Sequence, residues 1–208
     1  MDSKDWDARY AAADLVWSAA PNQWVEELVS PLPPGRALDV AAGEGRNAIW
    51  LVEQGWEAVA ADYSAVAVER ARALADDRLG DRAGRLTTVV SDATGPAPGG
   101  PAAYDLVLFS YLQLPMQDWR KALASGIEAA VPGGRVIVIA HALSNLTAGW
   151  GGPQDPAVLY DPEDVVTTVG NLAGPPVDVE LAELRTRHVV KDDEEHDALD
   201  TVVVLRRR

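Results

Sequence analysis

The chain has 208 residues, enough for one domain with a full hydrophobic core, and 48% of them are hydrophobic. Its formal net charge of −14 argues against a nucleic-acid substrate, because proteins that bind nucleic acid normally present a basic surface. The absence of cysteine excludes disulfides and thiolate metal sites, and His141, His188 and His196 lack metal-ligand spacing, so we expect no metal.

The N-terminus is charged and lacks an apolar signal core. No apolar run approaches the roughly 20 residues that span a bilayer. These features predict a cytoplasmic protein without a membrane partner.

Residues 1–35 precede the first predicted strand and are rich in aromatic side chains. Four of these side chains recur at intervals of four and seven: Trp6, Tyr10, Trp17 and Trp24. Pro21 interrupts any continuous helix, so one helix face cannot hold all four. We expect Trp24 to pack in the core. For Trp6 and Trp17, core packing and ligand contact both stay open.

The stretch Arg36–Asn47, which reads RALDVAAGEGRN, is the centre of the sequence. Its apolar residues predict a short buried strand, which Gly43 and Gly45 break, and a helix follows that ends near Gly55. A strand, a glycine turn and a helix form half of a nucleotide-binding crossover, in which backbone approaches the ligand closely. The free N–H groups at the helix start favour a polar or anionic ligand group.

Two carboxylates sharpen this prediction. Asp39 lies within the end of the first strand, and Asp62 ends the second, Glu57–Asp62, where a carboxylate can grip ribose hydroxyls. The segment Gly43–Ala48 also fits a looser dinucleotide fingerprint. However, Asp39 and Glu44 suit a ligand with a positively charged amino group better than a pyrophosphate, because like charges repel at short range.

The segment Leu38–Asn47 resembles motif I of the class I S-adenosylmethionine-dependent methyltransferases. Its Gly-Glu-Gly-Arg-Asn form resembles the branch that holds the tellurite-resistance and thiopurine methyltransferases. Many members of that branch have cysteine where this chain has Ala42. The specific resemblance extends from Trp6 to about Ser110, and beyond that it is architectural.

The resemblance implies S-adenosylmethionine as cofactor and S-adenosylhomocysteine as product. Asp62 is expected to bind the ribose, Tyr63 to pack on the adenine, and Asp92 to accept from the adenine amino group. Tyr63 as an ordinary surface tyrosine and Asp92 as a turn residue stay open. The complete expected cofactor-binding set is Trp6, Tyr10, Trp17, Asp39, Gly43, Gly45, Asn47, Asp62, Tyr63, Asp92, Ala93 and Ser110.

Three more strands of the parallel part are predicted at Leu86–Ser91, Tyr104–Phe109 and Arg135–Ala140. A helix after Pro115 is expected to stop at residues 132–134, Pro-Gly-Gly. Strands alternating with helices imply a parallel sheet.

The last third differs. Leu143–Leu159 reads as a long loop, and Asp161 as the cap of a short helix. A strand from Val177 to Val190, a charged loop Lys191–Asp197 and a strand Thr201–Leu205 then form an antiparallel hairpin. The resemblance implies such a terminal hairpin.

Together these elements predict an α/β fold: a Rossmann-like three-layer sandwich whose seven-stranded, mostly parallel sheet has an antiparallel C-terminal strand. We expect a single methyltransferase domain over 1–208. Within it, 1–35 forms an N-terminal cofactor lid with helices, and 141–175 forms a substrate-side loop and helix.

The predicted reaction is methyl transfer to a small-molecule acceptor by direct displacement. A general base is needed only if the acceptor must lose a proton. His141 follows the fifth strand and titrates near neutral pH, so it is the catalytic candidate, with a structural hydrogen-bonding role as the alternative. Tyr111 and Asp155 are weaker candidates. Trp150 could wall a substrate pocket or anchor its loop.

Two other functions stay open from the sequence: a nicotinamide-dependent oxidoreductase and a non-catalytic S-adenosylmethionine-binding protein. Asp39 and the terminal hairpin argue against the first. The expected assembly is a monomer or homodimer.

Overall fold

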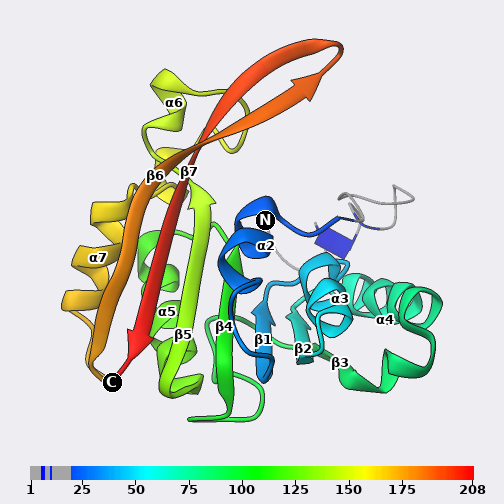
Figure 1. Cartoon of the computed structure of the whole chain (residues 1–208). Coiled ribbons are helices and arrows are strands. Elements are labelled where there is room, and N and C mark those ends of the chain that lie inside the picture. The colour runs from blue at the N-terminus through cyan, green and yellow to red at the C-terminus, as the bar shows by residue number, and fades with distance from the viewer. Residues whose placement is uncertain (1–5, 8–9, 11–19) are drawn as a thin grey trace.

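The computed structural model describes residues 6–7, 10 and 20–208. They contain one seven-stranded sheet in the order β3-β2-β1-β4-β5-β7-β6, which Figure 1 shows running through the molecule. The neighbours from β3 to β5 are parallel, whereas β7 runs antiparallel to both β5 and β6. The predicted fold is therefore confirmed. The strands are β1 Arg36–Val40, β2 Glu57–Asp62, β3 Leu86–Val90, β4 Tyr104–Ser110, β5 Ala130–His141, β6 Val177–Lys191 and β7 Glu194–Arg207.

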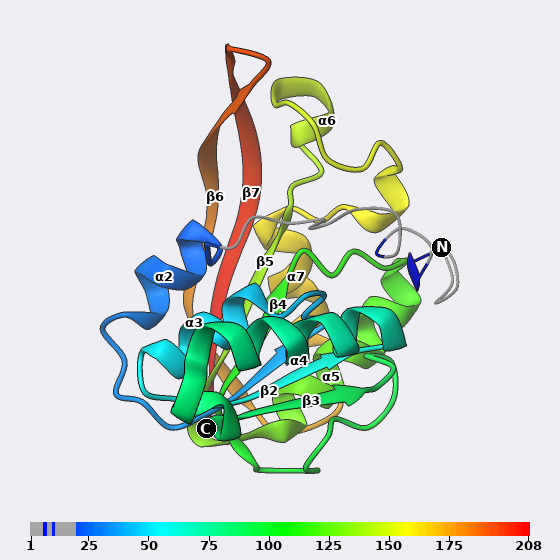
Figure 2. The same ribbon diagram turned by 90° about the vertical axis from the view of Figure 1, so that its right-hand side faces the viewer.

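Helices cover both faces of the sheet (Figures 1 and 2). Side chains of α2 (Gln23–Val29), α3 (Arg46–Glu53) and α4 (Ala65–Leu79) form one hydrophobic core with one face, and those of α5 (Met116–Ala129) and α7 (Pro162–Gly170) form the other. Because strand side chains alternate between faces, Leu106 and Leu108 join the first core while Val107 and Phe109 join the second. A short 3-10 helix, Gly80–Arg85, follows α4.

Side chains cap the first turns of two helices, one of them at the predicted Asp161. The Ser64 hydroxyl accepts from the Ala67 backbone N–H at the start of α4. At α7, Asp161 and Asp164 form a reciprocal capping box, with Pro162 at the first helical position. These caps define the residues at which α4 and α7 begin.

The C-terminal hairpin differs from its prediction. Only Asp192 and Asp193 form the turn, both at positive φ (53° and 63°), and β7 begins at Glu194. The predicted charged loop Lys191–Asp197 is therefore wrong. Residues 194–198 pair in register with β6 and not with β5, whose partners are residues 200–206. In Figure 1 this end of the hairpin projects beyond the sheet. A strand clear of the core needs no apolar residues, and a two-residue turn with φ > 0 suits Asp.

Two other boundaries also differ. The strand predicted from Arg135 begins at Ala130, with a register shift against β4 that accommodates Gly133 at φ 85°. The predicted long loop Leu143–Leu159 contains a four-residue helix, α6 (Asn145–Ala148), and a 3-10 turn, Pro156–Val158.

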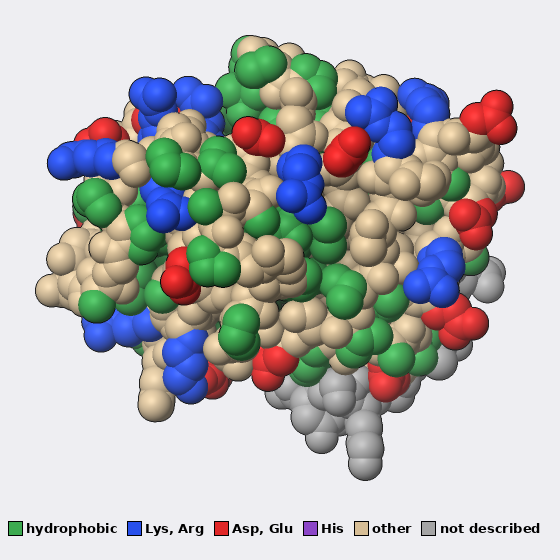
Figure 3. Space-filling model, turned by 90° about the horizontal axis from the view of Figure 1, so that it is seen from below, with side chains coloured by type: hydrophobic (Ala, Val, Ile, Leu, Met, Phe, Trp, Pro, Cys, Tyr) green, Lys and Arg blue, Asp and Glu red, His purple; other side chains and the backbone are tan. Residues whose placement is uncertain are grey.

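The described residues at the amino ends of the parallel strands carry charges of both signs. Figure 3, seen from below relative to Figure 1, shows Lys and Arg interspersed with Asp and Glu on this face. Within residues 6–7, 10 and 20–208, none of the helices has the length and apolarity to cross a membrane.

Candidate active site

The turn between β1 and α3 lies at the carboxyl ends of the parallel strands. Ala41, Gly43 and Gly45 adopt positive φ (57°, 57° and 77°), which bends the chain sharply between strand and helix. A Cβ on Gly45 would lie 3.0 Å from the Ala71 Cβ of α4. Glycine is therefore required at this position both for its conformation and for the close approach of α4.

Asp62 holds this turn from the end of β2. Its Oδ2 accepts from the Gly43 N–H and its Oδ1 from the Ser64 N–H, both at 2.9 Å. Burial raises the pKa of Asp62, while the backbone N–H groups of Ser64, Gly43 and Tyr63 oppose the rise. The carboxylate thus ties the β1–α3 turn to the β2–α4 turn, and the Tyr63 side chain that follows it is half-buried.

Asp39 is the most unusual group at this edge. It is 1% exposed, and neither carboxylate oxygen has a hydrogen-bond partner within the described part of the chain. Burial raises the pKa of Asp39 to about 7, although the positive charge of Arg46 opposes the rise. A buried carboxylate without a donor is costly, so this group indicates a site for a donor that the described residues do not supply.

Other predicted residues near the turn have partners of their own. The Asn47 Oδ1 accepts from the Asn22 N–H at 2.9 Å, which anchors the start of α2 to α3. Glu44 is 3% exposed and pairs with Arg70 at 3.0 Å, so its charge is compensated. At the end of β4, the Ser110 Oγ is buried without a hydrogen-bond partner in the described structure.

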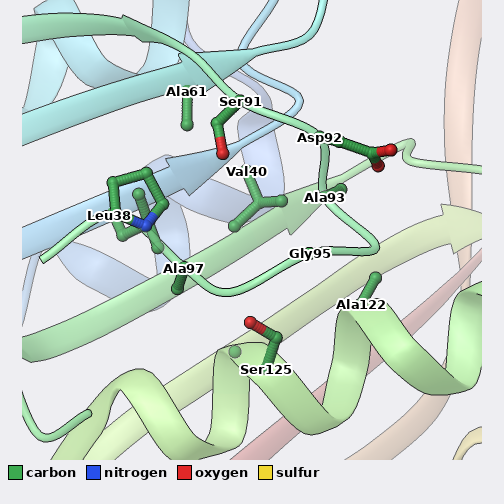
Figure 4. Close-up of a pocket in the computed structure, with 12 residues that line it drawn as sticks. Leu38, Val40, Ala61, Ser91, Asp92, Ala93, Gly95, Ala97, Ala122 and Ser125 are labelled. Atoms are coloured by element: carbon green, nitrogen blue, oxygen red, sulfur yellow. The ribbon is translucent and has the colours of Figure 1, made fainter. Parts of the chain in front are cut away.

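The segment after β3 lies over a small cavity between β1 and α5 (Figure 4). Asp92 and Ala93 both line this cavity. In Figure 4, however, the Asp92 side chain points away from the cavity, whose other side is lined by Leu38 and Ala97. The Asp92 Oδ1 accepts from the backbone N–H and the hydroxyl of Thr94, each at 2.8 Å. Asp92 therefore caps its own turn.

The described part of the N-terminal segment lies beside Asp62. The Asp7 Oδ1 accepts from the Ser64 hydroxyl at 2.5 Å and from the Val66 N–H at 3.5 Å. The rings of Trp6 and Tyr10 are 5.7 Å apart, and Tyr10 is 4% exposed. Trp17 lies outside the described residues.

A second polar group, centred on Asp200, was not predicted from the sequence. Asp200 of β7 is fully buried, and its Oδ2 accepts from three donors on three other segments. The donors are Trp24 Nε1 (2.9 Å), Tyr111 Oη (2.7 Å) and Arg187 Nε (2.7 Å). In the sequence, a single Asp before an apolar run is the only sign of this group.

His141 borders this group. Its ring lies 4.6 Å from that of Tyr111, and its Nδ1 is 3.6 Å from Asp200 Oδ1. That nitrogen is buried and makes no hydrogen bond within the described structure. Burial lowers the pKa of His141; Asp200 opposes this, and Arg187 adds to it. A Cβ on Gly152 would lie 3.0 Å from the His141 Cγ and Nδ1, so the loop packs directly against the ring.

Two weaker candidates have local structural roles. Trp150 stacks on His196 of β7, with ring centroids 4.3 Å apart and planes 6° from parallel. The Asp155 carboxylate accepts from the Ala157 N–H at 3.0 Å and caps its turn. In the described ranges, no group of three or more His, Cys, Asp or Glu side chains could hold a metal ion.

Comparison with known proteins agrees with this arrangement. Residues 37–134, which include β1, the glycine turn and Asp62, match the family model described as a methyltransferase domain. Residues 37–134 are thereby identified as a methyltransferase domain. The predicted resemblance is thus confirmed, and this family implies S-adenosylmethionine as cosubstrate.

Individual relatives add detail on similarity. The chain is 32% identical over 127 residues to a demethylmenaquinone methyltransferase of Clavibacter sepedonicus. This match covers 60% of the chain but 47% of that protein, so the chain spans about half the length of this relative.

Solved structures share the fold at low identity. One solved structure has a TM-score of 0.77 at 20% identity, and the match covers 99% of this chain and 91% of that chain. Its description is the conversion of a disulfide bond into a thioacetal group during echinomycin biosynthesis. TehB from Haemophilus influenzae has a TM-score of 0.71 at 11% identity, covering 100% and 68%. At these identities the likeness shows the methyltransferase fold alone.

Proposed function

We propose that this protein transfers the methyl group of S-adenosylmethionine to a small-molecule acceptor. The main support for the proposal is the buried carboxylate of Asp39 beside the glycine turn, which has no hydrogen-bond partner among residues 6–7, 10 and 20–208. A carboxylate in this position suits a ligand with an ammonium group, because the ion pair would offset the cost of burying the charge.

The residues present fit this cosubstrate. Asp39 would hold its amino-acid part, and the backbone of Gly43 and Gly45 would approach it closely. Asp62 would accept from the ribose hydroxyls. Tyr63 and the segment at Asp92 and Ala93 would lie beside the adenine, with Ser110 facing the same edge.

The N-terminal segment is proposed to close over the bound cosubstrate. The hydrogen bonds from Ser64 and Val66 to Asp7 support this proposal, because they hold the segment beside Asp62. Trp6 and Tyr10 would add apolar cover. Residues 141–175 are proposed to form the acceptor side, since the loop of Gly152 packs on His141 at the same edge.

Methyl transfer from S-adenosylmethionine needs few catalytic groups from the protein. S-adenosylmethionine, when bound, supplies a methyl group already activated by a positively charged sulfur. The chain's own residues would align the acceptor behind the methyl carbon and exclude water. The antiparallel β7, which is absent from the usual six-stranded dinucleotide fold, supports this function over a nicotinamide-dependent one.

Calorimetry with S-adenosylhomocysteine tests the proposal on the wild type and two variants. Asp39→Asn should weaken binding, whereas Asp76→Asn, an exposed position on α4, should not. Transfer of radiolabelled methyl to a panel of small acceptors then separates an enzyme from a protein that only binds the cosubstrate. A wild-type protein that binds NAD but not S-adenosylhomocysteine would overturn the proposal.

A further inference from the structure

β6 is the outermost strand at one edge of the sheet (Figure 1). Over Val177–Lys191 it pairs with β7 on its inner side. Along its outer side, no strand within residues 6–7, 10 and 20–208 pairs with its backbone N–H and C=O groups. Such an edge is a template to which another strand can add by backbone hydrogen bonds.

The backbone of Leu184 points to this outer side. The neighbouring β7 shows why, because the Leu199 carbonyl accepts from the Ala142 N–H at 3.0 Å and the Leu199 N–H donates to Asn145 Oδ1 at 2.7 Å. Leu199 therefore directs its backbone toward the β5 side, and so does Thr201, two residues on. Leu184 lies directly opposite Thr201, so the two do not form a hydrogen-bonded pair, and the N–H and C=O of Leu184 face the outer edge.

Exposed apolar side chains also gather on β6. Among the described residues, five large hydrophobic side chains are exposed, and three of them lie on this strand: Val179 (43%), Leu184 (47%) and Val190 (70%). Their partners on β7 are Leu205, Thr201 and Glu195, which are even numbers of residues apart, so all three side chains point to the same face of the sheet. Several exposed apolar side chains on one face of an unpaired edge fit a surface that another chain covers.

The charges of β6 are divided between its two halves. The acidic side chains lie in the first half and the basic ones in the second: Asp178, Glu180 and Glu183, then Arg185, Arg187 and Lys191. When two copies of this strand pair antiparallel, the acidic half of each faces the basic half of the other. A parallel pairing would place like charges opposite each other, which is destabilising. The strand is therefore complementary to a second copy of itself in one direction only.

We propose that two copies of this chain pair through β6, antiparallel and centred on Leu184. This residue is the midpoint of Val177–Lys191 and the junction of the acidic and basic halves. The two Leu184 residues would lie opposite each other, and their outward backbone groups would exchange two hydrogen bonds. Glu183 of each copy would lie opposite Arg185 of the other. Glu183 already pairs with Arg185 of its own strand at 3.0 Å, but it keeps 51% of its surface exposed and can accept from a second donor.

Sedimentation equilibrium over a concentration series tests this dimer, and the result does not depend on the proposed methyl transfer. The wild type should show about twice the 22.2 kDa mass of one chain. Leu184→Lys should show the mass of a single chain, because it places two like charges directly opposite each other. The matched control is Val90→Lys, which adds the same charge at a 55% exposed valine on β3, the opposite edge strand, and should stay dimeric. A wild type that is monomeric throughout, or a Leu184→Lys variant that is still dimeric, would overturn the proposal.

The register has its own test, because the chain contains no cysteine and a single introduced thiol has no rival. Leu184→Cys should be joined into a covalent dimer by a short thiol–thiol crosslinker, since the two thiols would lie opposite each other. Val90→Cys, at a comparably exposed position on the other edge, should stay uncrosslinked. This pair of variants also decides the matter if circular dichroism shows that Leu184→Lys is unfolded. No crosslinking of Leu184→Cys, or equal crosslinking of Val90→Cys, would count against the pairing of β6.

Discussion

Replacing Asp39 with asparagine should stabilise the protein and weaken its cofactor binding at the same time. The Asp39 carboxylate is 1% exposed and has no hydrogen-bond partner within the described structure, and its burial raises the pKa from 3.8 to about 7. At about 1.4 kcal/mol per pKa unit, this interval corresponds to roughly 4 kcal/mol of stability that ionised Asp39 costs the unliganded protein. Asparagine has a similar shape and avoids that cost.

The stability gained by Asp39→Asn should depend on pH. Because the folded protein holds this proton more tightly than the unfolded chain, wild-type stability should fall as pH rises from 3.8 through about 7. Below pH 3.8 both forms carry a neutral side chain, so Asp39→Asn should gain nothing there. Its advantage should grow across this interval and level off above it.

Urea denaturation of both proteins at pH 5 and pH 8 measures this difference. At pH 8 the free energy of unfolding of Asp39→Asn should exceed that of the wild type by up to about 4 kcal/mol, with a smaller excess at pH 5. Calorimetry should show affinity for S-adenosylhomocysteine lowered by about 1.5–3 kcal/mol, the range for a hydrogen bond to a charged group. A variant no more stable than wild type at pH 8, or one with an advantage that does not change with pH, would refute the reasoning.

Three other substitutions are each expected to change cofactor binding or stability in a measurable way. Asp62→Ala should weaken S-adenosylhomocysteine binding by about 2–4 kcal/mol in calorimetry, because a carboxylate holding two hydroxyls makes charge-assisted hydrogen bonds; equal affinities would remove the ribose assignment. Gly45→Ala should lower the free energy of unfolding by at least about 1–2 kcal/mol, owing to φ 77° and the close Ala71 Cβ; an unchanged urea midpoint would contradict this. Asp200→Asn should destabilise by about 3–5 kcal/mol, because it leaves the Arg187 charge without its partner; a change below 1 kcal/mol would argue against that pairing.

The sequence predicted the fold wherever local chemistry decides it. Motif I identified the turn at Gly43 and Gly45, because only a few residue types tolerate such backbone. The cap at Asp161 marked a helix start for the same local reason. These signals need no knowledge of distant partners.

The predictions failed where distant contacts decide the outcome. The charged residues Glu194–Asp197 read as a loop, but they extend β7 because a projecting hairpin pairs backbone without needing a core. Trp24 was expected only to pack, yet its indole N–H donates to Asp200, 176 positions away. Such pairs depend on the register of the last strands, which no local pattern specifies.

The antiparallel direction of β7 explains how the Asp200 group reaches the carboxyl edge. In a parallel strand, the first residues lie at the amino edge of the sheet, away from the site. Reversing β7 places its early residues at the carboxyl edge instead, where Asp200 pairs in register with His141. The preceding β6 then delivers Arg187 to the same edge as it approaches the hairpin. The final hairpin is therefore the element that brings a buried carboxylate and its arginine to the imidazole, while the glycine turn at the same edge comes from the first third of the chain.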